Sequence, residues 1–181
     1  QVLFGNHYGN WARDPNWKPF TTIERWTRSH NFAPNIQEYA KYVNRFMTHF
    51  KGRVRFIESW NEPDLLGFAN FPMETYNEIQ KEYYKAAKAA DPNVIALTGG
   101  YTAFRLPCPE SSPHPEYFTQ SLVDTKGHYD VVAFHAHGQV SGYAPQVDKM
   151  NAAFKELDID KPWWSNETAV SSVNIGETAQ A

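Results

Sequence analysis

The stretch FIESWNEPDLLGF, Phe56 to Phe68, joins an apolar, β-prone run to a carboxylate held beside a proline. The run is typical of a buried strand, and Pro63 is a residue that ends strands. Glu62 therefore stands at the very end of a predicted strand. Such a strand either points an acid into a site or simply stops in a turn, and Asp64 fits the turn as a cap.

Strands and helices alternate on both sides of this stretch. Apolar runs predict strands over residues 1–5, 54–60, 94–100, 129–138 and 162–167. Helical spacing of apolar residues predicts helices over 36–50, 75–90 and 116–126, and another marked by Val147, Met150, Phe154 and Leu157. Strands joined by helical crossovers form a parallel sheet.

Two parallel architectures fit this order, an open doubly wound sheet and a closed (β/α)8 TIM barrel. The first strand is followed by FGNHYGN, which lacks the GxGxxG spacing of a dinucleotide-binding turn. Five strands are too few to close a barrel, which typically takes about 250 residues. The sequence therefore predicts an α/β fold in which residues 1–181 are a partial TIM-barrel catalytic domain.

The composition limits the kinds of partner. The 181 residues carry a net charge of −3, with 41% hydrophobic and 15% aromatic residues, and basic residues do not cluster. This pattern disfavours nucleic acid, and no apolar run reaches the length of about 18 residues that suggests a membrane span. The single cysteine, Cys108, excludes an internal disulfide. No signal peptide is visible, but the chain opens inside a strand pattern, so a signal could have been removed or trimmed away. The compartment stays open, and a secreted or extracellular protein is favoured over a cytoplasmic one.

Reactive groups of parallel α/β folds gather where strands end. The predicted strand ends carry His7, then Asn61 and Glu62, then His135 and His137, and last Glu167. Tryptophans flank both carboxylates, in SWNEPD and in WWSNE, so Trp60 and Trp164 are candidates for contact with a sugar. A pair of carboxylates across one cleft is typical of glycoside hydrolysis.

WNEPD at 60–64 and WWSNET at 163–168 resemble the large clan of (β/α)8 retaining glycoside hydrolases. The flanking segments look most like its β-xylosidase and α-iduronidase family, and the resemblance covers strands three to seven. It implies that Glu62 is the acid/base, Glu167 the nucleophile, and Asn61 the partner of the sugar 2-hydroxyl. VVAFHAHG resembles a sixth strand that often has His-x-Tyr. His135 fits this pattern, and His137 replaces a tyrosine that usually contacts the nucleophile, which puts that contact in doubt.

The two carboxylates suffice for this chemistry with water, so no cofactor and only a carbohydrate substrate are expected. An ionised Glu167 would keep the proton on Glu62 by like-charge repulsion, and formation of a glycosyl ester would end that repulsion. The oligomeric state does not follow from the sequence.

Two other functions stay open. His135 and His137 lie on one face of a strand, as in metal-dependent TIM-barrel hydrolases, and Glu62 or Glu167 would complete such a site. The chain could also be a non-catalytic carbohydrate-binding relative.

Three further expectations concern single groups. If Glu58 points into the barrel, its charge needs a partner such as Arg53 or Arg55. Asn166 begins a glycosylation sequon, and a glycan there would block the site, so we expect it to be unmodified. Trp11, Trp17 and Trp26 are possible stacking platforms in the first long loop.

Overall fold

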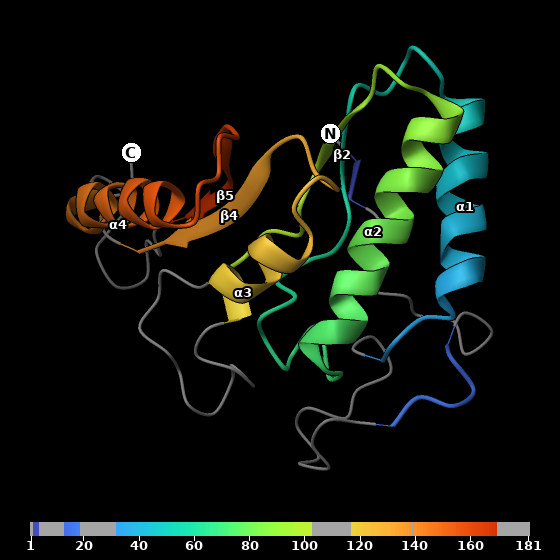
Figure 1. Ribbon diagram of the computed structural model, residues 1–181, viewed down its shortest axis with the longest axis horizontal. Helices are drawn as coiled ribbons and strands as arrows, with labels where there is room; N and C mark the ends of the chain where they lie inside the picture. The colour runs from blue at the N-terminus through green and yellow to red at the C-terminus, as the bar shows by residue number, and fades with distance from the viewer. Residues whose placement is uncertain (1, 4–12, 19–31, 103–116, 139, 170–181) are drawn as a thin grey trace.

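The computed structural model describes residues 2–3, 13–18, 32–102, 117–138 and 140–169 (Figure 1). Strands and helices alternate along it as the sequence predicts. They are β1 (Val2–Leu3), α1 (Ile36–His49), β2 (Phe56–Glu58), α2 (Met73–Ala90), β3 (Ile95–Leu97), α3 (Tyr117–Asp124), β4 (Val132–His137), α4 (Tyr143–Glu156) and β5 (Trp163–Ala169). A short 3-10 turn, Val140–Gly142, leads into α4.

The strands form one arc in which neighbours in sequence are neighbours in space. β1, β2 and β3 pair in parallel in that order, and β4 pairs in parallel with β5. Single parallel bridges, Leu97 to Val131 and Tyr101 to Phe134, join β3 to β4. A doubly wound sheet reverses its strand order at a switch point, whereas a barrel runs in sequence order. The fold is therefore part of a TIM barrel, which confirms the predicted class.

Alternate strand residues face two different apolar layers. Ile57, Ala96 and Val132 belong to the outer layer, between the strands and the helices, with the inner faces of α1 and α2. Leu97 and Ala133 belong to the inner layer, on the concave side of the arc. The inner layer consists of Leu97, Val131 and Ala133, with Phe56, Ile95 and Trp164 packed against them.

Local sequence explains where α1 begins. The Asn35 side chain accepts a hydrogen bond from the Glu38 backbone N–H at 3.2 Å and is the N-cap of the helix. Tyr39, Val43 and Met47 then fall on one buried face at helical spacing. α1 lies beside α2 over the outer side of the sheet (Figure 1).

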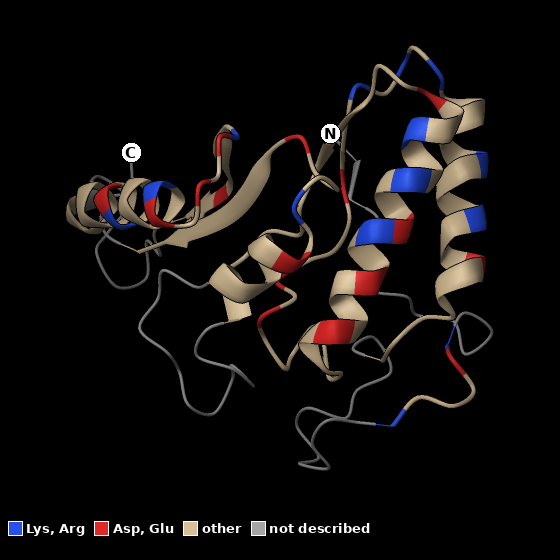
Figure 2. Ribbon diagram, in the orientation of Figure 1, with Lys and Arg blue, Asp and Glu red and all other residues tan. Residues whose placement is uncertain are grey.

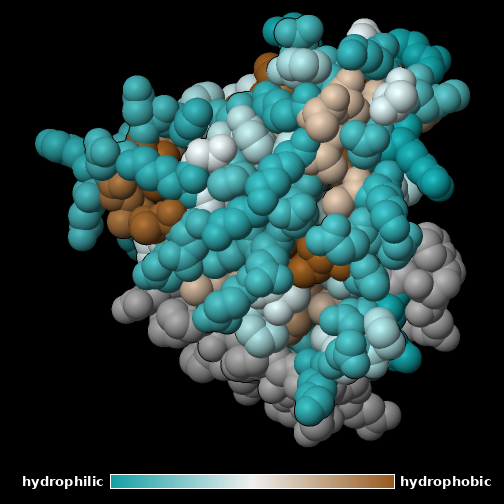
Figure 3. Space-filling view, turned by 45° about the vertical axis from the view of Figure 1, so that its right-hand side comes forward, coloured by the Kyte–Doolittle hydropathy of each residue, from teal (hydrophilic) through white to brown (hydrophobic). Residues whose placement is uncertain are grey.

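The sequence also accounts for α2. This helix begins two residues before the predicted Thr75, because Pro72 supplies the extended N-cap, and it ends where Pro92 follows Asp91. Acidic side chains lie in its first turns and basic ones in its last turns, with both signs in the middle (Figure 2), an order that suits the helix dipole. The outer face of this helical layer is largely hydrophilic (Figure 3).

The strands are mostly shorter than predicted. β2 spans three residues where seven were expected, because the flanking residues meet their neighbours only through single bridges, such as that between Asn61 and Gly100. β5 instead continues two residues beyond the predicted end at 167. None of the described helices combines the length and apolar composition that crossing a membrane requires.

Candidate active site

Four of the predicted site residues meet where β2, β4 and β5 end. Glu62 follows β2, His135 and His137 close β4, and Glu167 lies near the end of β5. One donor atom from each of the four lies within 4.8 Å of the others. Residues up to 105 positions apart in the chain are thus brought together by the arc of strands.

Glu62 has an unusual backbone. Its φ of 45° lies in the left-handed region, which is sparsely populated by residues other than glycine, asparagine and aspartate. Its carbonyl accepts a hydrogen bond from the Leu65 N–H at 3.0 Å, so the chain turns immediately after the strand. The side chain is buried, with the residue 8% exposed. A strained backbone held by a tight turn is typical of functional positions.

His135 links the two carboxylates. Its Nδ1 forms a hydrogen bond with Glu62 Oε1 at 2.8 Å and lies 3.6 Å from Glu167 Oε2. Burial of the ring lowers the pKa of His135, but the hydrogen bond with Glu62 and the charges of both carboxylates raise it more. The net pKa of His135 lies above its ordinary value.

A glycine makes room for the His135 ring. A Cβ built on Gly100 would overlap the imidazole, so any larger residue at this position would displace it. Gly100 follows β3, and its N–H donates to the Trp60 carbonyl at 3.3 Å. Because Gly100 after β3 has no side chain, the His135 ring of β4 can occupy this space.

His137 makes the contact that the resemblance assigns to a tyrosine. Its Nε2 lies 3.0 Å from Glu167 Oε1. The sequence left this contact in doubt, and the structure shows an imidazole in that place. One oxygen of Glu167 thus lies beside His137 and the other faces His135.

A β-bulge in β5 turns Glu167 towards the histidines. Phe134 pairs with Ser165, but the next residue of β4, His135, pairs with Glu167. Asn166 is therefore the extra residue of β5, and regular alternation is broken there. The Glu167 side chain remains 53% exposed and is thus accessible from solvent.

Glu58 lies buried beneath this site. It is 3% exposed, and its Oε2 accepts a hydrogen bond from Asn166 Nδ2 at 2.6 Å. The expectation of an Arg53 or Arg55 partner is wrong: both arginines are exposed, and each guanidinium lies over a phenylalanine ring. The same contact engages the Asn166 nitrogen that a glycan would occupy, while the absence of a glycan stays a prediction.

Asp64 holds the neighbouring loop and is not among the four clustered residues of the site. Its carboxylate accepts hydrogen bonds from the Thr102 N–H and hydroxyl at 3.0–3.1 Å. Burial raises the pKa of Asp64 to about 6, although these hydrogen bonds lower it. It therefore ties the turn after β2 to the segment after β3, beyond the simple cap that the sequence suggests.

Of the two tryptophans predicted to contact a sugar, Trp60 is buried and Trp164 belongs to the inner layer. Trp60 is 0% exposed, packs against Tyr39 and Phe71, and donates from Nε1 to the Phe68 carbonyl, so it cannot stack on a sugar. Trp164 is half-buried and packs edge-on against Phe56 in the inner layer, with ring centroids 5.2 Å apart. Trp164 thus lies closer than Glu167 to the amino ends of the strands.

The remaining candidates divide between the site and the rest of the chain. Asn61 is half-buried beside Glu62 and pairs with Gly100 in a single parallel bridge. Trp17 donates from Nε1 to the Asn70 carbonyl at 3.1 Å and packs on Phe32. His7, Trp11, Trp26 and Cys108 lie outside the described residues.

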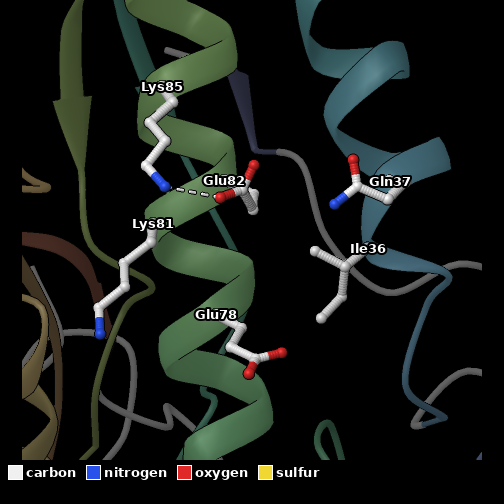
Figure 4. A pocket seen from close by; sticks show the side chains of 6 residues that line it. All are labelled: Ile36, Gln37, Glu78, Lys81, Glu82 and Lys85. Atoms are coloured by element: carbon white, nitrogen blue, oxygen red, sulfur yellow. Dashed lines mark hydrogen bonds and ion pairs between the residues drawn. The ribbon is translucent and has the colours of Figure 1, made fainter.

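A surface depression of about 330 Å³ lies on the outer side of the sheet, between α1 and α2 (Figure 4). Long charged side chains of α2 line it, with Lys85 paired to Glu82 at 2.7 Å, and Ile36 and Gln37 of α1 close the other side. It contains none of the four clustered residues, so we regard it as solvated helix surface.

Together, the arc of parallel strands and the polar cluster at its carboxyl end define a TIM-barrel segment with a candidate active site. A scan against protein-family models gives no match, and neither does a search of the curated proteins.

Solved structures do share the fold. A monomeric β-xylosidase from Caulobacter crescentus CB15 aligns over 77% of this chain at 20% identity, with a TM-score of 0.61. An endo-β-1,3-glucanase of family GH128 from Sorangium cellulosum aligns over 90% at 16% identity, with a TM-score of 0.56. A GH10 protein from Paenibacillus barcinonensis aligns over 89% at 14% identity, with a TM-score of 0.53. The chain spans 32%, 65% and 47% of these proteins, respectively.

Proposed function

We propose that this chain carries the catalytic pair of a retaining O-glycoside hydrolase, with Glu62 as the acid/base and Glu167 as the nucleophile. The observation that carries the proposal is the short distance between the two carboxylates, whose nearest donor atoms lie within 4.8 Å. Retaining enzymes place their carboxyl groups about 5–5.5 Å apart, whereas inverting enzymes leave about 6.5–9.5 Å for a water molecule. A closest approach within 4.8 Å fits the shorter of these two separations, and this supports double displacement.

In the first step, an oxygen of Glu167 attacks the anomeric carbon, and the bond from that carbon to the leaving oxygen breaks. Glu62 gives its proton to the leaving oxygen. His137 holds Glu167 Oε1 at 3.0 Å, which fixes the carboxylate while Oε2 stays available for attack. The product is a neutral glycosyl ester on Glu167.

In the second step, Glu62 takes a proton from water, whose oxygen attacks the anomeric carbon and releases Glu167. The partner of Glu62 is already in place, because His135 Nδ1 lies 2.8 Å from its Oε1 and can donate or accept. Conversion of Glu167 to an ester removes one of the three carboxylate charges, those of Glu167, Glu62 and Glu58, that raise the pKa of His135. His135 can then more readily return to its neutral form as Glu62 changes role.

A carbohydrate is the substrate that this machinery suits. The fold is shared with a β-xylosidase and an endo-β-1,3-glucanase, which supports a glycoside without selecting one. Asn61, beside the acid/base, is the candidate partner of the sugar 2-hydroxyl, where a hydrogen bond strengthens in the transition state.

A metal-dependent hydrolase is the second candidate, and one observation favours it. Two imidazole nitrogens and two carboxylate oxygens within 4.8 Å form a donor set that zinc accepts. The close hydrogen bond between His135 and Glu62 weighs against it, because Nδ1 and Oε1 at 2.8 Å already satisfy each other. A tetrahedral ion would hold its ligands about 2.0–2.2 Å from itself and would need both groups to separate.

The test is the hydrolysis of aryl glycosides by the protein and its Glu167→Ala variant, with added azide. We expect the variant to lose turnover and azide to restore it, giving a glycosyl azide of the anomeric configuration opposite to the substrate. Hydrolysis that survives Glu167→Ala and stops with a chelator would instead support the metal enzyme. A folded wild-type protein that binds glycans and hydrolyses none would support a non-catalytic binding relative.

A further inference from the structure

The bulge in β5 and the buried Glu58 lie side by side, and the mechanism above uses neither. We propose that Glu58 is a positioning residue that holds the bulge at Asn166 and thereby aims Glu167 into the site. The inference rests on the proposed role of Glu167 and extends it to a residue of β2, on the opposite side of the arc.

Side-chain alternation along β5 is interrupted at the bulge. Trp164 faces the inner layer against Phe56, and Asn166, two residues on, also faces inward to Glu58. Regular alternation would send the next residue, Glu167, to the helix-covered side. The bulge adds one residue against β4, so Glu167 also points inward and reaches both histidines.

The extra residue, Asn166, is held by its side chain. A bulged residue gives up its regular place in the ladder and depends on other contacts. Asn166 Nδ2 donates to the Glu58 carboxylate at 2.6 Å. The charge of an ionised carboxylate strengthens such a hydrogen bond. The other polar atom of this side chain, Oδ1, is buried with no hydrogen-bond partner among the described residues. The bond to Glu58 therefore sets the orientation of the Asn166 amide.

Glu58 is a buried ionisable group. A carboxylate that is 3% exposed is costly to desolvate, and an apolar residue would fill the inner layer at lower cost. A carboxylate has a use here that an apolar residue lacks, because it is the acceptor that fixes Asn166. Its negative charge is also among those that raise the pKa of His135.

The experiment exchanges the donor and the acceptor. Glu58→Gln and Asn166→Asp are measured singly and together, because the double variant restores one amide-to-carboxylate hydrogen bond in the reverse direction. Asn166→Asp alone would place two carboxylates in contact, and we expect kcat to fall by about 100-fold, the effect of a displacement of about 1 Å. We expect a smaller fall for Glu58→Gln and recovery of most of the loss in the double variant.

Two readouts separate positioning from loss of fold. Active sites are counted with a 2-fluoro glycoside that labels the nucleophile, so kcat is expressed per competent site, and KM is measured alongside. Positioning lowers kcat per site and leaves KM within a few-fold, whereas misfolding lowers the number of sites. Glu78→Gln, an exposed charge on α2, is the matched control and should leave all these values unchanged.

Crystal structures of the variants give a readout besides activity. The inference predicts that Asn166→Asp loses the bulge or turns Glu167 away from His137, and that the double variant restores both. An unchanged bulge in Asn166→Asp, or a double variant as impaired as that single variant, would overturn the inference. If Glu167→Ala still hydrolyses glycosides, the proposed function fails, and the crystal structures still decide whether Glu58 holds the bulge.

Discussion

Gly100 leaves the space that the His135 ring occupies, so a single methyl group there should disturb the site. We predict that Gly100→Ala displaces His135 from Glu62, lowers kcat/KM by about 100-fold, and costs about 1–3 kcal/mol of stability as an overpacked position. Steady-state kinetics with denaturant unfolding would measure both effects. Gly142→Ala is the control, because a Cβ there meets only Gln146 Nε2, at 4.0 Å. Equal activity of the two variants would contradict the prediction.

His135 should make stability depend on pH. Its pKa is raised in the folded protein, so its protonation stabilises the fold fully below its unfolded pKa of about 6.5. This contribution is lost as pH rises through the folded pKa. We predict that the unfolding free energy of the wild type relative to His135→Asn decreases as pH rises above about 6.5. Unfolding in urea across this range would show it, with His49→Asn, an exposed histidine of α1, as the control. A difference that stays constant or grows with pH would contradict the prediction.

Single residues also mark where sequence reasoning succeeded and where it stopped. Glu62, His135, His137 and Glu167 were predicted from strand ends, because parallel strands present their last residues at one rim. The burial of Trp60 was not predictable from its place beside Glu62, because the rings that cover it, Tyr39 and Phe71, come from other segments of the chain. Nor was the partner of Glu58, because a hydrogen bond across 108 residues leaves no local pattern.

At the scale of elements, local chemistry sets where α1 begins. Replacing the Asn35 cap with alanine removes the acceptor for the Glu38 N–H, so we predict a loss of about 0.5–2 kcal/mol. Activity per folded molecule should not change, since α1 lies on the outer side of the sheet. Asn35→Asp keeps a capping oxygen and should retain most of the stability. Chemical denaturation of both variants is the measurement, and equal losses would show that the cap is not responsible.

Element order and type followed from hydrophobic periodicity, while the boundaries of the strands did not. Apolar residues continue beyond the paired segments, as in the run from 129 to 138 around β4, since chain leading into a buried sheet is itself buried. The bulge in β5 was also missed, because WWSNET has no glycine or other local signal of an extra residue. Pairing partners decide both features, and they come from distant parts of the chain.

At the scale of the whole molecule, the inner layer ties β2 to β5. Phe56 and Trp164 meet edge-on with ring centroids 5.2 Å apart. A double-mutant cycle with Phe56→Leu and Trp164→Leu should give a coupling of about 0.5–1.5 kcal/mol in unfolding free energy. Phe56→Leu combined with Tyr42→Leu, an exposed residue of α1, should be additive. Absence of coupling in the first pair would mean that the strands are held together by other contacts.

The hydrogen bond between Glu58 and Asn166 has a consequence for folding during synthesis of the protein. A ribosome adds about 5–20 residues per second, so Asn166 emerges about 5–20 s after Glu58, from which it is 108 residues distant. During that interval β2 and its helices are already made, but the amide that fixes the bulge is not. The hydrogen bond from Asn166 to Glu58 therefore forms only once β5 has been made. Translation that pauses between α2 and β5 would lengthen the exposure of the inner layer, and with it the opportunity for aggregation.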